Sequence, residues 1–293
     1  MTIKHLVFSG GSWKGLIMMG VVKELFEQKY LVMEEIESMW CTSVGGLISI
    51  LIALNISWET IIEYYLNVSI KFSDKKFSFE NIVNIYKESG VLSKDIIYQL
   101  LKSFFIFVNL DIETVTLKEF YEYSGKEIHF FCVNYENIET TDFNYISHPD
   151  VKLIDVFYCS SAIPIIFKPN KINGTIFIDG GINLHYPLNK CIEKYDNEEN
   201  IFGLNSITDD VNTLEFTNVL QYAMNILRKI VFFNQRKNTK KIKNQITIIN
   251  RSMDIMKLFE IMKKKNKRQV IIENGIKNAK DFLLNNANNE ISE

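Results

Sequence analysis

Residues 36–54 read IESMWCTSVGGLISILIAL, and this stretch decides the fold. Residues 36–41 predict a short strand, and residues 42–46 predict a tight turn. Residues 46–54 are apolar on every side, which predicts a helix that is buried all round. A strand that leads through a turn into a buried helix is the building unit of α/β folds.

The same order of elements appears earlier in the chain. Residues 3–8 predict a short strand buried on both faces, and residues 9–15, SGGSWKG, form a glycine-rich turn. Residues 16–30 then place apolar side chains at helical spacing. Two strand–loop–helix units in succession predict a layered α/β fold with right-handed crossovers.

Capping signals and changes of hydrophobic period predict the remaining elements. Ser57, Ser93 and Thr116 stand where helix N-caps are expected, and Glu119 completes a capping box with Thr116. The polar residues 285–293 are expected to fray. The expected helices are 58–70, 94–107, 116–123 and 149–160, and the expected strands are 127–134, 139–145, 201–205 and 245–250, with residues 171–178 expected as a strand or as a hairpin around Gly174.

Composition favours a folded protein built as one continuous domain. Of the 293 residues, 47% are hydrophobic and 23% are charged, which excludes general disorder, collagen and coiled coil. The 13 glycines and 4 prolines leave little material for a flexible linker. We therefore expect the C-terminal third to continue the domain that the first two units begin.

Cysteine usage and hydropathy predict a cytoplasmic protein without a structural metal. The four cysteines are far apart, with no Cys-x-x-Cys pair and no histidine at zinc-finger spacing. The N-terminus shows no apolar signal-peptide core, which indicates a reducing, intracellular setting. The most apolar stretch, residues 44–54, is shorter than the roughly 20 residues that cross a bilayer.

The charges are segregated along the chain. Residues 228–268 hold 14 basic and two acidic residues, a net charge of +12, so the remainder carries −14. This basic segment predicts either a surface that meets phosphate, in lipid headgroups or nucleic acid, or an ordinary solvated helical face. Nucleic acid is the weakest of these partners, because no RNA-reading motif is present.

Ser43 occupies the position of a nucleophile elbow, between a predicted strand and a predicted buried helix. In Cys41-Thr42-Ser43-Val44-Gly45 the sharp turn requires small residues two before and two after the serine. Gly45 meets this requirement and Cys41 meets it in part. The following helix would point its N-terminal amides at the reacting atoms, which helps an oxyanion to form. A structural serine in a tight turn is the alternative.

The glycine-rich loop Gly10-Gly11-Ser12-Trp13-Lys14-Gly15 is the second candidate element. Its backbone amides can hold an anion, either a nucleotide phosphate or the oxyanion of a tetrahedral intermediate. A P-loop requires the lysine after the last glycine, whereas Lys14 precedes it. A dinucleotide fingerprint requires glycine where Ser12 stands. Both nucleotide interpretations are weakened.

Asp179-Gly180-Gly181 directly follows the predicted strand that ends at Ile178, so the acid lies on the rim of the sheet. Alone, such an acid most often caps nearby amides. A loop after the first strand, a serine elbow after the next and an Asp-Gly-Gly far downstream together resemble the patatin-like phospholipase family. Residues 160–169, SSAIPIIFKP, are similar to the family's stretch ahead of the aspartate.

This resemblance covers about residues 5–192 and implies a three-layer α/β/α fold with a mainly parallel central sheet. It implies that Ser43 is the nucleophile and Asp179 the general base of a Ser-Asp dyad. The implied oxyanion hole lies at Gly10, Gly11 and Ser12, with Lys14 and Gly15 completing the loop. The implied reaction is hydrolysis of phospholipid or related lipid esters through an acyl-enzyme, without metal or cofactor. Residues 193–293 are then a helical, basic continuation of the same domain.

Three departures from the family pattern leave alternatives open. The family has glycine where Cys41 and Ser12 stand, and asparagine where His185 stands. A catalytically weakened lipid- or protein-binding module is therefore the alternative function. Ser43, Asp179 and His185 also follow the chain order of α/β-hydrolase triads. In α/β-hydrolases the acid and the histidine usually lie on separate loops, whereas Asp179 and His185 are only six residues apart. The Ser-Asp dyad is therefore favoured over a triad.

Membrane contact is the last expectation. Residues 104–108, FFIFV, predict either core helix or lipid contact. Together with the basic segment they would suit a cytoplasmic enzyme that meets the membrane peripherally.

Overall fold

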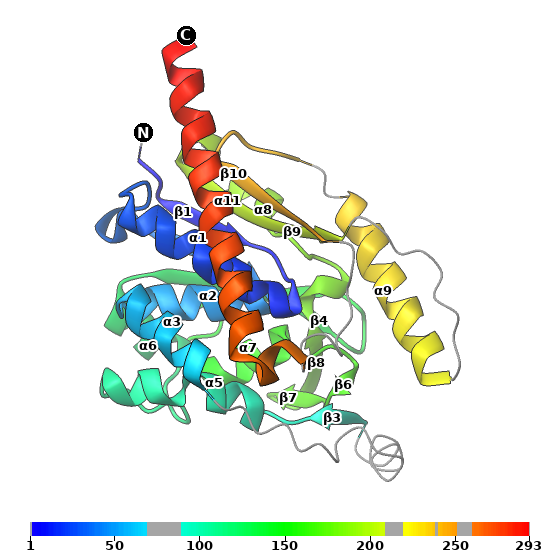
Figure 1. Cartoon of the computed structure of the whole chain (residues 1–293). Coiled ribbons are helices and arrows are strands. Elements are labelled where there is room, and N and C mark those ends of the chain that lie inside the picture. The colour runs from blue at the N-terminus through cyan, green and yellow to red at the C-terminus, as the bar shows by residue number, and fades with distance from the viewer. Residues whose placement is uncertain (1, 69–88, 209–218, 238–239, 251–259, 293) are drawn as a thin grey trace.

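The computed structural model describes residues 2–68, 89–208, 219–237, 240–250 and 260–292. Its centre is an eight-stranded sheet of order β10-β9-β1-β2-β4-β8-β7, with β5 also paired to β4 (Figure 1). Neighbours from β10 to β4 run parallel, and β8, β7 and β5 join in antiparallel pairs. The strands are β1 His5–Phe8, β2 Ser38–Thr42, β4 Glu127–Asn134, β5 Thr140–Phe143, β7 Asn170–Ile172, β8 Thr175–Asp179, β9 Ile201–Thr208 and β10 Gln245–Asn250.

Helices cover both faces of this sheet, as the α/β prediction requires. A smaller two-stranded sheet, of β3 (Gly90–Leu92) and β6 (Ile165–Phe167), was not predicted from the sequence. The helices are α1 Gly15–Glu27, α2 Val44–Ala53, α3 Trp58–Asn67, α5 Asp95–Phe107, α6 Leu117–Ser124, α7 Leu153–Ser160, α8 Leu188–Tyr195, α9 Val219–Lys237 and α11 Lys265–Ser292, with short 3-10 turns η1 Ser12–Lys14 and η4 Gly180–Ile182.

Alternating side chains of the central strands enter two separate apolar clusters, one on each face of the sheet. Leu6 and Phe8 of β1 belong to the larger cluster, whereas Val7 belongs to the smaller one. In β2, Cys41 joins the larger cluster and Trp40 the smaller. The strands are therefore buried on both sides, which is why their sequences lack a polar face.

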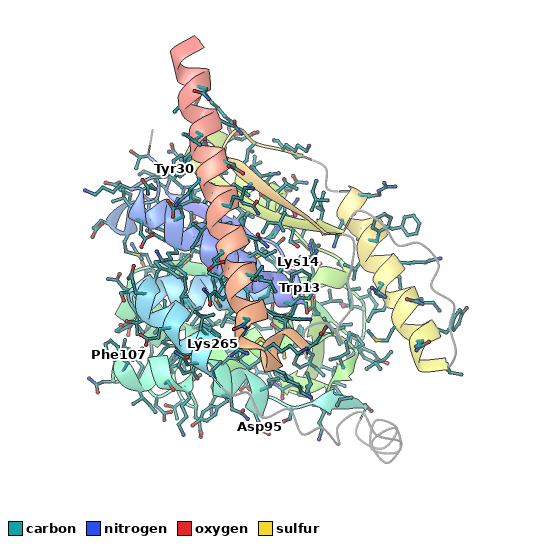
Figure 2. The ribbon with its side chains drawn as sticks, in the orientation of Figure 1. Trp13, Lys14, Tyr30, Asp95, Phe107 and Lys265 are labelled. Carbon is teal, nitrogen blue, oxygen red and sulfur yellow. The ribbon has the colours of Figure 1, made fainter. Side chains whose placement is uncertain are left out.

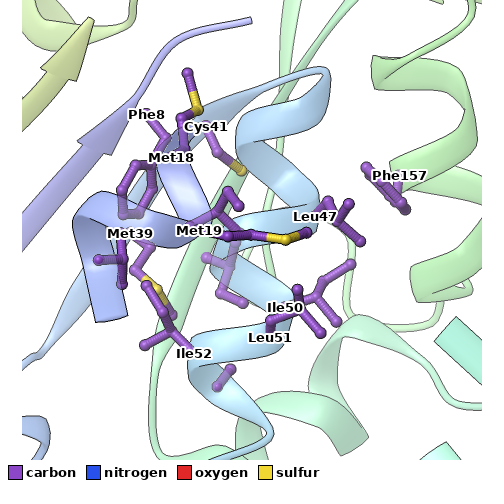
Figure 3. Packing of buried hydrophobic residues seen from close by; sticks show 14 of the residues in the cluster. Phe8, Met18, Met19, Met39, Cys41, Leu47, Ile50, Leu51, Ile52 and Phe157 are labelled. Carbon is purple, nitrogen blue, oxygen red and sulfur yellow. The ribbon is translucent and has the colours of Figure 1, made fainter. Parts of the chain in front are cut away.

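The larger cluster holds the helix that follows Ser43. Every residue from Gly45 to Ala53 is buried, which confirms the prediction of a helix with no solvent-facing side. Leu47, Ile50 and Leu51 of α2 pack close to Met19 of α1 (Figure 3). Burial on all sides fixes the axis of α2 and therefore the direction in which its N-terminus points.

The C-terminal helix α11 crosses α1 at backbone contact (Figure 1). A Cβ atom on Gly20 would overlap the carbonyl oxygen of Ile272, and one on Gly275 would overlap that of Ile17. In the tail expected to fray at 285–293, the structure continues α11 to Ser292. Once a packed helix is nucleated, each further residue adds a hydrogen bond at little cost. Among the described helices, none has the length and hydropathy of a membrane span.

Candidate active site

Ser43 lies in the turn that joins β2 to α2, with φ 54° and ψ −123°. A positive φ is costly for serine, and such strain is typical of a nucleophile elbow. The turn is held by Ser160, whose hydroxyl accepts a 3.0 Å hydrogen bond from the Ser43 amide and donates a 2.8 Å bond to the carbonyl of Phe131. One side chain thus ties the elbow backbone to strand β4.

The neighbours of Ser43 explain why this turn needs small residues. A Cβ atom on Gly45 would lie 2.7 Å from the carbonyl oxygen of Phe8, so only glycine fits without a backbone shift. Cys41 is fully buried, and its thiol donates to the carbonyl of His129 at 3.2 Å. The departure from glycine at this position is therefore accommodated inside the core. The Thr42 hydroxyl donates to the carbonyl of Leu184 at 2.8 Å.

Asp179, the last residue of β8, meets Ser43. Its carboxylate accepts a 2.6 Å hydrogen bond from the Gly181 amide, and Asp179 and Ser43 line the same cavity. Burial raises the pKa of Asp179 to about 6, and the bonds from Gly181 and Ser43 oppose this rise. A carboxyl group of this pKa can accept a proton from serine near neutral pH.

The glycine-rich loop lies beside this pair, but its amides are not all available. The Gly10 amide donates to the carbonyl of His185 at 3.0 Å, and the Gly15 amide donates back to Ser12 within the turn. In the described part of the chain, the amides of Gly11 and Ser12 have no such acceptor. Of the three amides predicted for an oxyanion hole, that of Gly10 is thus already hydrogen-bonded, and those of Gly11 and Ser12 stay candidates.

Ser12 explains the family preference for glycine at its position. It has φ 53°, a left-handed conformation that glycine adopts without strain. Lys14, two residues on, is 3% exposed, and its ammonium group donates to the carbonyl of Ile207 at 3.4 Å. Burial lowers the pKa of Lys14 to about 8. A positive charge thus lies in the wall of the site at neutral pH.

His185 supports the loop and takes no part in a triad-like chain of hydrogen bonds. Its Nε2 donates to the carbonyl of Ser206 at 2.7 Å, and a Cβ atom on Gly10 would lie 3.2 Å from its Nδ1. Burial lowers the pKa of His185 to about 4, so the ring is neutral at physiological pH. The backbone and the ring of His185 together hold Gly10 in place.

Two cavities meet at Ser43. The first, of about 80 Å³, lies between the glycine-rich loop, Asp179 and helix α9, and we call it the α9 cavity. The second, of about 130 Å³, reaches from Ser43 to helix α5 and is called the α5 cavity. Ser12, Trp13 and Ile163 border both, and Figure 2 shows Trp13 and Lys14 between α11 and α9. An extended ligand at Ser43 could therefore occupy both cavities at once.

The α5 cavity is lined almost entirely by apolar side chains, among them Leu16, Leu47 and Leu100. The aromatic run 104–108 contributes none of its lining. Phe104 and Phe105 are buried in the core, whereas Phe107 is 70% exposed. The aromatic run therefore lies partly in the core and partly on the surface. The α5 residues that line the cavity, such as Ile97 and Leu100, come from the preceding turns of the helix.

Helix α9 is the part of the site that sequence reasoning missed. Its residues Met224, Leu227, Arg228, Val231 and Gln235 line the α9 cavity opposite the glycine-rich loop. The available signal was the spacing of three and four residues between these positions, which places them on one helical face. From its charges, this region was predicted only to be part of a basic segment.

The described part of that basic segment is divided among several elements. Arg228, Lys229 and Arg236 lie on α9, whereas Lys240 pairs with Glu198 at 2.6 Å. Arg268 is buried in α11, where it donates to carbonyl groups of Met262, Leu66 and Val68. Residues 238–239 and 251–259 lie outside the described residues. Among the described residues, no group of three or more His, Cys, Asp or Glu side chains could hold a metal ion.

The chain is similar to known proteins in sequence and in fold. The profile of the family "Patatin-like phospholipase" matches residues 6–192. A probable lipid hydrolase of Invertebrate iridescent virus 6 is 28% identical over 200 residues, 67% of this chain and 66% of that protein. An uncharacterized protein of Acanthamoeba polyphaga mimivirus is 22% identical over 96% of this chain and 94% of its own length.

Among solved structures, VipD from Legionella pneumophila matches with a TM-score of 0.52 at 14% identity, over 97% of this chain and 67% of VipD. This likeness concerns the fold. The chain thus spans about two thirds of the length of the iridescent virus protein and of VipD.

Proposed function

Because the chain belongs to the patatin-like phospholipase family, matched over residues 6–192, we propose that it is a lipid acyl hydrolase. It would cleave carboxylic ester bonds of phospholipids or related lipids as a serine esterase. The observation that carries the proposal is the placement of Ser43 and Asp179, both at most 7% exposed, in the wall of the same cavity, where hydrogen bonding from the Ser43 side chain lowers the pKa of Asp179.

In the proposed reaction the Ser43 hydroxyl attacks the ester carbonyl while the Asp179 carboxylate takes its proton. The tetrahedral oxyanion accepts hydrogen bonds from the amides of Gly11 and Ser12, and the N-terminus of α2 adds a favourable dipole. Asp179 then returns the proton to the departing alcohol, which leaves an acyl group on Ser43. A water molecule, activated by the same carboxylate, hydrolyses this ester and restores the serine. No cofactor enters these steps.

The lining of the two cavities supports a lipid ester as the substrate. An acyl chain fits the apolar lining of the α5 cavity, where its burial is favourable. Lys14 and Arg228 border the α9 cavity, and cations there can neutralise the phosphate of a phospholipid. The ester carbonyl would then lie between the two cavities, beside Ser43.

We also propose that the protein acts in the cytoplasm and meets membranes peripherally, since its substrate resides in bilayers. The four cysteines are buried free thiols, which suits a reducing compartment.

A fluorophosphonate probe tests the nucleophile directly, because labelling requires an activated hydroxyl. The purified full chain is expected to be labelled at Ser43 and to hydrolyse a soluble short-chain acyl ester. Ser43→Ala should lose both properties, whereas Ser147→Ala, at an exposed serine, should retain both. A folded protein that is neither labelled nor active would instead be a binding module that retains the fold.

A further inference from the structure

Helix α9 has two apolar faces that point in opposite directions. One face carries Met224, Leu227 and Val231, which line the α9 cavity. These positions and Gln235 are separated by three or four residues, so they share one side of the helix. An amphipathic helix of a globular protein normally has polar residues on its other side. Here the other side is apolar as well.

The outer face presents a stripe of exposed apolar side chains. Ile226, Ile230 and Phe233 are 43%, 42% and 60% exposed, and Tyr222 and Val219 continue the stripe toward the N-terminus of α9. At about 100° per residue, this stripe lies roughly half a turn from the cavity-lining face. We call these five residues the outer stripe. A contiguous exposed apolar surface of this kind marks a site of interaction.

The charges of α9 indicate what this surface meets. The helix sequence, residues 219–237, contains basic residues and no acidic one. Lys229 and Arg236 are exposed beside the outer stripe, and the Arg236 guanidinium lies 4.8 Å from the centre of the Phe232 ring. Apolar side chains flanked by basic ones are typical of helices that lie in the interface of anionic membranes.

The position of α9 connects this surface to the catalytic residues. The helix stands at the edge of the molecule (Figure 1), and it packs on η4, the turn that directly follows Asp179. The Asn234 side chain donates to the carbonyl of Ile182 in that turn. A bilayer in contact with the outer stripe would therefore lie one helix diameter from the α9 cavity.

We propose that the outer stripe of α9 docks on bilayers that contain anionic phospholipids and so brings the α9 cavity to the membrane surface. The proposal rests on the proposed function for its purpose, because the docked bilayer supplies the substrate. The docking itself is a property of the helix surface and can be measured without catalysis.

The test uses the full chain with Ser43→Ala, so that vesicles stay intact, and measures co-flotation with phosphatidylcholine vesicles with and without phosphatidylserine. The double variant Ile226→Gln/Phe233→Gln is expected to bind at least about tenfold more weakly, since two apolar side chains no longer enter the membrane. The control Ile106→Gln/Phe107→Gln removes the same two residue types from α5, where they are 61% and 70% exposed. Phe107 lies at the opposite edge of the molecule (Figure 2), so this control should bind as the parent does.

A second variant tests the charges without changing the stripe. Lys229→Gln/Arg236→Gln should weaken binding to vesicles with phosphatidylserine by about fivefold per charge and leave binding to pure phosphatidylcholine unchanged. Circular dichroism of each variant, compared with its parent, verifies the fold.

Equal binding of the parent and the stripe variant would overturn the proposal, as would an equal loss in the α5 control. A change in molar mass of the stripe variant without vesicles would also overturn it, because the stripe would then be a protein interface. With Ser43 intact, the stripe variant should still hydrolyse a soluble short-chain ester. If the Ser43→Ala chain docks but the chain with Ser43 intact does not hydrolyse that ester, the proposed function fails while docking stands.

Discussion

The floor and the roof of the candidate site are built in different ways. The floor consists of Ser43, Asp179 and the glycine-rich loop, all at ends of central strands and all tied to the backbone of the sheet. The roof is α9, which lines the cavity through side chains and donates the Asn234 amide to η4. The residues proposed for the chemistry thus lie at strand ends, whereas the cavity beside them is completed by a peripheral helix.

Replacing Asp179 by Asn tests the floor and has the largest expected effect. The amide cannot take the serine proton, so kcat/KM for a soluble ester should fall on the order of 10³-fold or more. Steady-state hydrolysis measures this loss. A variant within tenfold of the parent would remove Asp179 from the role of base.

The same substitution should raise stability, which separates a catalytic role from a structural one. The pKa of Asp179 is raised from 3.8 to about 6 in the folded protein, so its stability contribution is complete below pH 3.8 and is lost as the pH rises through 6. At pH 8 the free energy of unfolding of Asp179→Asn should exceed that of the parent, by up to about 3 kcal/mol. Denaturant unfolding should show this gap closing near pH 4.

The pH dependence of hydrolysis by the unsubstituted protein tests Asp179 and Lys14 separately. With ionised Asp179 as the proposed base, kcat/KM should rise as the pH increases through about 6 and should fall about tenfold per unit below it. On an anionic phospholipid, KM should increase above pH 8, where Lys14 loses its charge. For a neutral ester, KM should not increase above pH 8. The same increase with a neutral ester would argue against Lys14 as the partner of the phosphate.

Two adjacent glycines test how tightly the floor is built. Gly45→Ala directs a Cβ atom at the backbone of Phe8, whereas Gly46→Ala meets the movable rings of Phe130 and Phe157 at 3.0 Å. Gly45→Ala should therefore lower the free energy of unfolding by about 2 kcal/mol and Gly46→Ala by less. Urea unfolding at one pH compares them. Equal losses would show that the elbow backbone adjusts more freely than its contacts indicate.

The roof should respond least in stability. Val231→Ala, on the cavity face of α9, should shift the preference between small and large phospholipid headgroups a few-fold and lower the unfolding free energy by less than about 1 kcal/mol. Val22→Ala, at a fully buried position of α1, should cost about 1–2 kcal/mol. Equal destabilisation would mean that α9 is as much part of the core as α1.

The sequence predicts the elements around Ser43 and the cap of α6 because the signals for them are local. The strand before Ser43, the buried helix after it and the capping box at Thr116 and Glu119 depend on neighbouring residues, and the structure contains each of them. The parallel central sheet also follows from repeated local units.

The remaining features depend on distant contacts. The Gly10 amide donates its hydrogen bond to the carbonyl of His185, so it is not free to donate to an oxyanion. Ser160 holds the elbow across more than 100 residues of sequence. The part of α9 in the site cannot be predicted from local sequence, because it depends on how α9 packs opposite the glycine-rich loop. Each of these pairings has no signature in the local pattern of either partner.

The close crossing of α1 and α11 has a consequence for the order in which the site is assembled. Helix α1 continues from the glycine-rich loop, and α11 fills the groove along it through Gly20 and Gly275. During synthesis the ribosome releases Ser43 and Asp179 long before α11. A nascent chain therefore carries both reactive groups while α1 still lacks its partner helix, and competence to act on lipid is expected only once the C-terminal helix is in place.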